Sequence, residues 1–83
     1  MTRDFKCAIL KVLDESKEPK PIKDLVDLAL KTEKIKPEMA EKAVDWMLTD
    51  LTALTAASMI IKNGRAEDQT FKITEKGKQY LIR

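Results

Sequence analysis

The spacing of apolar residues changes abruptly near residue 58 of this 83-residue chain. Before that point apolar side chains recur every three or four residues, the spacing that lines one face of a helix. After it, Met59-Ile60-Ile61 and Thr70-Phe71-Lys72-Ile73 are short runs of extended character on either side of an Asn63-Gly64 turn signal. The chain is therefore expected to fold as helices followed by a β-hairpin, which is an α+β arrangement.

Three helices are predicted ahead of this change, near residues 2–15, 21–32 and 37–56. Thr2 is the expected N-cap of the first helix, and Pro21 and Pro37 suit the start of the other two. Two prolines within residues 17–21 force an extended link between the first and second helices. The expected core-facing residues are Phe5, Ala8, Ile9, Val12 and Leu13, then Ile22, Leu25, Val26, Ala29 and Leu30, and then Ala40, Val44, Met47, Leu48, Leu51, Leu54 and Thr55.

A short helix is expected to close the chain, with Thr74 as its N-cap. Gly64 and Gly77, the only glycines, are expected at turns, where their backbone freedom is needed. The order of elements is then helix, helix, helix, strand, strand, helix. No internal repeat or linker-like segment divides the chain, so residues 1–83 are expected to form a single domain.

The stretch from residue 46 to residue 81 resembles the winged-helix superfamily. The likeness rests on Leu54-Thr55-Ala56-Ala57-Ser58-Met59-Ile60, on the hairpin, and on Phe71-Lys72-Ile73-Thr74-Glu75-Lys76-Gly77. In that family a step of small residues joins the third helix to the first wing strand, and Ser58 stands where the step usually has glycine. The whole chain looks most like the N-terminal domain of Mrr-type restriction endonucleases, in which a tryptophan, here Trp46, precedes the step. The resemblance implies a winged-helix fold with a three-helix core, a two-stranded hairpin wing and a short C-terminal helix.

Catalysis and metal binding are not expected. The chain has no histidine and a single cysteine, Cys7, so it can assemble neither the usual zinc ligand sets nor an internal disulfide. It also lacks a glycine-rich phosphate loop and a nucleophile elbow. No apolar run is long enough to span a bilayer, and the first 13 residues lack the features of an export signal. We therefore expect a cytoplasmic, non-enzymatic protein without a cofactor, a small-molecule substrate or a membrane anchor.

The distribution of charge indicates which surface could meet a phosphate backbone. The net charge is +2 over residues 1–36, −3 over residues 37–57 and +3 over residues 58–83. The resemblance implies that the third helix enters the major groove of duplex DNA and that the wing contacts phosphates or the minor groove. The residues expected at the phosphates are Lys62, Arg65, Lys72 and Lys76. The residues of the third helix expected to contact either the groove or a protein partner are Lys42, Trp46, Thr49 and Ala53.

A protein partner is the alternative. From Ala43 to Ala57 the third helix has no Lys, Arg, Asn or Gln, the side chains that usually recognise bases. The hairpin cations could also serve only to keep a strand edge soluble. Trp46 lies away from the predicted core face, so either the second helix or the hairpin covers it, or it anchors a homodimer or another protein. Four acidic residues on helix faces are expected in solvent: Asp24, Asp27, Asp45 and Asp50.

Overall fold

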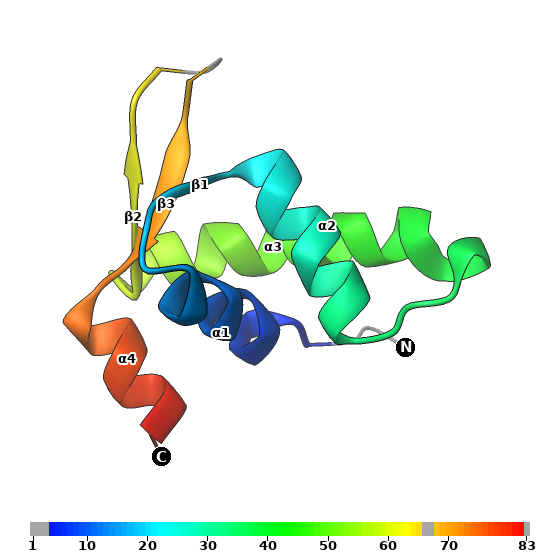
Figure 1. The fold of residues 1–83 in the computed structure, drawn as a ribbon, viewed down its shortest axis with the longest axis horizontal. Coiled ribbons are helices and arrows are strands. Elements are labelled where there is room, and N and C mark those ends of the chain that lie inside the picture. Colours follow the sequence, from blue (N-terminus) through cyan, green and yellow to red (C-terminus); the bar gives the residue numbers. More distant parts are fainter. Residues whose placement is uncertain (1–3, 66–67, 83) are drawn as a thin grey trace.

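The computed structural model describes residues 4–65 and 68–82, and these form an α+β fold. Its elements in chain order (Figure 1) are α1 (Lys6–Ser16), β1 (Lys20–Pro21), α2 (Ile22–Thr32), the 3-10 turn η1 (Pro37–Met39), α3 (Ala40–Ala56), β2 (Ile60–Asn63), β3 (Thr70–Ile73) and α4 (Glu75–Ile82). The predicted helices, hairpin and closing helix are all present. The expected start of the first helix is wrong: α1 begins at Lys6 with Phe5 in the N-cap position, so Thr2 does not cap it. Thr2 itself and the centre of the hairpin tip lie outside the described residues.

In the described part of the chain, three antiparallel strands form one sheet in the order β1-β3-β2. β2 and β3 form the predicted hairpin, in which Ile60 lies opposite Ile73. The expectation of only two strands is incomplete, because the extended link before α2 contributes β1, whose Lys20 lies opposite Phe71. Two residues are too few to show an alternation of apolar and polar side chains, so the link carries no strand signal in the sequence.

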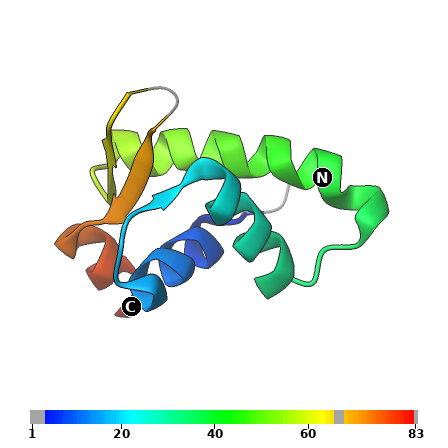
Figure 2. The same ribbon diagram turned by 45° about the horizontal axis from the view of Figure 1, so that its top comes forward.

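The core lies where α1, α2, α3 and one face of the sheet meet. Every residue predicted for the apolar face of the first helix is buried, from Phe5 to Leu13. The other helices and the sheet complete this core with Leu25, Ala29, Ala43, Met47, Leu51, Leu54, Ile60, Phe71 and Ile73. In Figures 1 and 2, α3 runs along one side of α1 and α2, and the hairpin stands near the C-terminal end of α3. The sheet therefore closes one end of a layer of helices.

The face that α3 buries differs in part from the predicted one: Met47, Leu51 and Leu54 are buried as expected. Leu48, expected in the core, is 39% exposed, whereas Asp50, expected in solvent, is only 9% exposed. The Asp50 carboxylate is tolerated there because its Oδ2 accepts a 2.8 Å hydrogen bond from the backbone amide of Phe5. Its Oδ1 lies 3.6 Å from Nζ of Lys6. α3 is therefore turned about its axis relative to the prediction, so that Asp50 faces the start of α1. The spacing of apolar residues cannot reveal a polar contact of this kind.

The turn between α3 and β2 is tied to the start of α4. Ser58, in this turn, has a φ of +62°. Oγ1 of Thr74 donates a 2.7 Å hydrogen bond to the Ser58 carbonyl oxygen and accepts a 3.2 Å bond from the Gly77 amide, so the predicted N-cap is confirmed. The prediction that Gly77 lies at a turn is wrong. Gly77 is inside α4, where a Cβ would collide with the Met59 carbonyl oxygen and lie 2.8 Å from Cγ1 of Ile73.

Candidate functional site

The hairpin projects from the body of helices (Figures 1 and 2). Its two faces carry different side chains. Lys62 lies opposite Phe71, and Ile61 lies opposite Lys72. Side chains that face each other across an antiparallel pair lie on the same side of the sheet. Because Phe71 is buried against the helices, Lys62 lies on the inner face of the hairpin and Lys72 lies on the outer face.

On the outer face, Lys72 shares a small hollow with Lys17 and Lys78. Lys17 follows α1 and Lys78 belongs to α4, so three separate elements bring these cations together. The same hollow of about 180 Å³ is lined by Asp14 and by Glu18, whose carboxylate lies 3.4 Å from Nζ of Lys20. We call Lys17, Lys72 and Lys78 the outer lysines.

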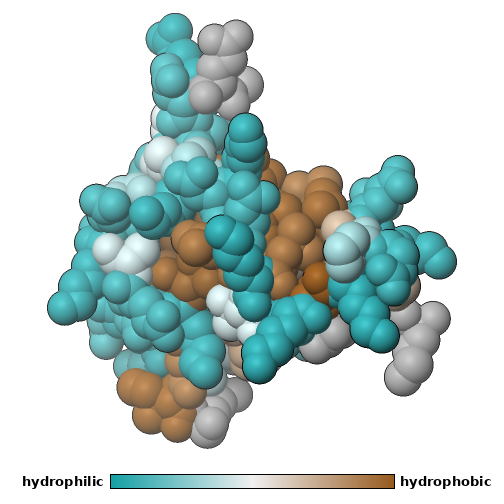
Figure 3. Space-filling view, turned by 45° about the vertical axis from the view of Figure 1, so that its right-hand side comes forward, coloured by the Kyte–Doolittle hydropathy of each residue, from teal (hydrophilic) through white to brown (hydrophobic). Residues whose placement is uncertain are grey.

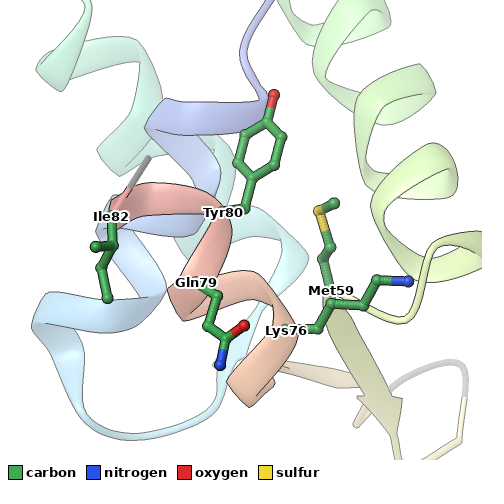
Figure 4. Close-up of a pocket in the computed structure, with 5 residues that line it drawn as sticks. All are labelled: Met59, Lys76, Gln79, Tyr80 and Ile82. Atoms are coloured by element: carbon green, nitrogen blue, oxygen red, sulfur yellow. The ribbon is translucent and has the colours of Figure 1, made fainter.

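Arg65 and Lys76, two of the cations predicted to contact phosphates, lie elsewhere. Arg65 is exposed just after Gly64, whose φ of +90° marks a turn that glycine adopts without strain. Lys76 lies beside Tyr80 and Gln79 in a separate hollow between α4 and the start of β2 (Figure 4). The predicted phosphate contacts Lys62, Arg65, Lys72 and Lys76 are thus exposed but do not share one surface. Among the described residues, none of the four forms an ion pair.

Sequence reasoning missed Lys17, which becomes a neighbour of Lys72 only through the folding of the extended link. β1 pairs with β3 and brings the end of α1 close to the hairpin base. The prolines on either side of Lys20 indicate an extended segment, but they do not show which strand it pairs with. In α4, Lys78 lines the same hollow as Lys72, whereas Lys76 lines a different one.

The residues predicted to enter the major groove centre on a different side of α3 from the side that faces the hairpin. Lys42, Thr49 and Ala53 are exposed, and Trp46 is half-buried. The α3 side chains that lie near Lys62 are instead Leu48, Leu51, Thr52, Thr55 and Ala56. At ~100° of rotation per residue, the centres of the two sets are roughly a third of the helix circumference apart. The sets meet at one edge, because Thr49 and Ala53 lie three residues before Thr52 and Ala56 of the second set. Lys42 and Trp46 belong to the first half of α3, whereas the hairpin stands near its C-terminal end.

Trp46 packs against Phe5, a contact that the sequence did not predict. Its ring stacks on that of Phe5, with centroids 6.4 Å apart and planes at 23°. Trp46 also lines a hollow with Ile35 and Met39, from the segment between α2 and α3. The tryptophan thus packs against the core at its edge and is only partly available to a partner.

The threonines of α3 already use their hydroxyl hydrogens. Thr49 donates to the Asp45 carbonyl oxygen at 3.2 Å, Thr52 to that of Leu48 at 3.1 Å, and Thr55 to that of Leu51 at 2.8 Å. A phosphate oxygen only accepts hydrogen bonds, so these hydroxyls would have to rotate before they could bind one. The threonines therefore add little to a phosphate site.

Another hollow, of about 460 Å³, lies between the start of α2, α3 and the inner face of the hairpin. We call it the α3 groove, and its lining includes Ile22, Leu48, Thr52, Ala56, Lys62 and Gln69. Ile22 was predicted in the core, yet it and Leu48 are each 39% exposed. Lys62 is the only charged residue among the described residues that line the groove. Figure 3 shows apolar surface exposed below the projecting hairpin.

Within residues 4–65 and 68–82, no three His, Cys, Asp or Glu side chains lie where they could share a metal ion. None of the helices in that part of the chain has both the length and the apolar character needed to cross a bilayer.

Comparison with models of known protein families finds no match, and no curated protein or solved structure is significantly similar to the chain. The function therefore has to be argued from the chain's own surfaces.

Proposed function

We propose that the chain is a winged-helix protein that binds duplex DNA through its hairpin and the outer lysines, by phosphate contacts that are independent of base sequence. The observation that carries this proposal is the gathering of Lys72 with Lys17 and Lys78 at the base of a hairpin that projects from the body. The proposal includes no catalytic step, metal or cofactor.

The order of elements supports the winged-helix part of the proposal. Three helices are followed by two hairpin strands and a short closing helix, and a two-residue strand precedes the second helix. Ser58 adds a second argument, because the superfamily usually has glycine at this step. Its φ of +62° lies in the left-handed region, which glycine enters without steric cost.

The phosphate part rests on unpaired positive charge. Among the described residues Arg65, at the hairpin turn, and Lys72, on its outer face, have no carboxylate partner. Cations of this kind bind a DNA backbone by releasing its condensed counterions, which makes affinity depend steeply on salt. Lys62 and Lys76 lie on other surfaces, so the proposal gives them no phosphate contact.

Base recognition by α3 is not part of the proposal. Glu41 and Asp45 are exposed on this helix and would repel phosphates of an approaching duplex. Lys42, its one cation, lies on the flank away from the hairpin's inner face. The hairpin and the outer lysines can bind without inserting α3 into a groove, so we expect the same affinity for duplexes of different sequence.

The test is a titration of labelled duplexes of two unrelated sequences at several salt concentrations. With four phosphate contacts, from Arg65 and the outer lysines, the logarithm of the binding constant should fall against that of the salt concentration with a slope of about −4. Lys72→Glu should weaken binding to both duplexes. Its matched control is Lys31→Glu, the same charge change at the far end of α2. Absence of binding at low salt, or equal losses for the two variants, would contradict the proposal.

A further inference from the structure

The α3 groove leaves a large apolar side chain, that of Leu48, uncovered at the middle of α3. Leu48 lies there with Ile22 of α2, each 39% exposed. Leu48 is seven residues after Glu41 and eight residues before Ala56, which lines the groove beside Lys62. The uncovered leucine is therefore close to the midpoint between the acidic start of α3 and the hairpin.

The two ends of this surface carry opposite charge. Glu41, Asp45, Leu48 and Thr52 follow one another at helical spacing and so share one side of α3. Glu41 and Asp45 are exposed at one end of this row. At the other end lies Lys62, the one charged side chain among the described groove residues. A surface with a negative end, an apolar centre and a positive end is complementary to its own copy turned by 180°.

We infer that the α3 groove is the interface between two copies of this chain related by a two-fold axis near Leu48. The α3 helices of the two copies would lie antiparallel across the axis, with the two Leu48 side chains at the centre. Glu41 of one copy would then lie beside Lys62 of the other, twice in the same dimer. An interface of this kind uses the same patch on both copies and closes after two chains.

The inferred dimer is independent of DNA binding, because the two proposals use opposite faces of the hairpin. Lys62 lies on the inner face, toward the groove, and Lys72 lies on the outer face. The dimer would leave the outer lysines of both copies in solvent. Loss of one property therefore does not require loss of the other.

The first test measures the mass of the full chain in solution over a range of concentrations. Leu48→Asp places a charge at the centre of the apolar contact and should raise the dimer dissociation constant by roughly 30-fold or more. The control is Leu28→Asp, because Leu28 is 37% exposed on α2 and does not line the groove. This control should keep the wild-type dissociation constant. A wild-type chain that stays monomeric up to about 1 mM would overturn the inference.

The second test reverses charges and distinguishes the antiparallel arrangement from other dimers. Lys62→Glu and Glu41→Lys should each raise the dissociation constant by about 10-fold, because like charges then meet at both ends. The double variant Lys62→Glu/Glu41→Lys restores opposite charges in both pairs and should recover most of the affinity. A double variant weaker than either single variant would overturn the arrangement, as would a mass that grows beyond two chains. The dimer dissociation constant of the Lys72→Glu variant should equal that of the wild type.

Discussion

The backbone amide of Phe5 donates a 2.8 Å hydrogen bond to Oδ2 of Asp50, which lies 45 positions further along the chain. The bond joins the start of α1 to the middle of α3, and Lys6 Nζ lies 3.6 Å from the other oxygen of the same carboxylate. Phe5 is fully buried, so its amide would pay a desolvation cost without an acceptor. The carboxylate is therefore a structural contact between two helices that are distant in the sequence.

Removal of this contact should destabilise the fold. Asp50→Ala takes the acceptor from a buried amide, and we expect the free energy of unfolding to fall by about 2 kcal/mol. Asp50→Asn keeps an oxygen acceptor and loses only the charge, so its effect should be about half as large. Urea unfolding followed by circular dichroism measures both. Asp45→Ala, at an exposed acid five residues earlier in α3, is the control and should change stability little.

Leu48 and Asp50 show why the rotation of α3 could not be predicted from the sequence. Apolar spacing alone assigns Leu48 to the core and Asp50 to solvent. The observed arrangement depends on donors from Phe5 and Lys6, and these reach Asp50 only after α1 and α3 have packed. Helix periodicity contains no information on such a distant partner, so the buried carboxylate and the exposed leucine both escaped prediction.

Features set by neighbouring residues could be predicted more completely. The hairpin follows from a change of apolar spacing around Asn63-Gly64, and the N-cap Thr74 follows from a short polar residue before a helical run. For the candidate site, the sequence predicted that Lys72 and Arg65 are exposed. It could not show that Lys17 joins Lys72, because this depends on how a two-residue strand pairs with β3.

The left-handed backbone at Ser58 offers a stabilising change. A residue with a Cβ is strained at a φ of +62°, whereas glycine is not. Ser58→Gly should therefore raise the free energy of unfolding by about 0.5–1 kcal/mol. The bond from Thr74 survives, because it reaches the Ser58 backbone oxygen. Ala57→Gly is the matched control: Ala57 has a φ of −84°, so added freedom there should lower the midpoint of thermal unfolding.

Substitution of Gly77 by alanine should lower the stability of the fold, although Gly77 lies in a helix. Alanine is favoured over glycine by about 1 kcal/mol in a helix interior. A Cβ at Gly77, however, would collide with the Met59 carbonyl oxygen, which is backbone and cannot swing away. We expect Gly77→Ala to cost about 2 kcal/mol in spite of its helix propensity. Gln79→Ala, an exposed change in the same helix, should cost little; equal unfolding midpoints for the two variants would contradict the collision.

Trp46 should contribute to stability more than to partner binding. Its stacking on Phe5 and its contact with the core predict that Trp46→Ala lowers the free energy of unfolding by about 2 kcal/mol. Trp46→Phe keeps an aromatic ring and should lose less than half of that. Chemical unfolding and mass measurement on the same samples separate the two roles. A Trp46→Ala chain that is as stable as the wild type but no longer dimerises would instead make Trp46 an interface anchor.

Lys42 and Arg65 distinguish DNA binding by the hairpin from DNA binding by α3. Both are exposed cations, so each substitution by alanine removes the same unit of charge. Arg65→Ala should lower affinity for any duplex by about fivefold and make the salt slope shallower by about 1, as expected when one phosphate contact is lost. Lys42→Ala should change affinity by less than about twofold, because Lys42 lies on the α3 flank away from the hairpin. If Lys42→Ala instead gave the larger loss, and gave it for one duplex sequence only, α3 would be reading bases and the hairpin would have the secondary role.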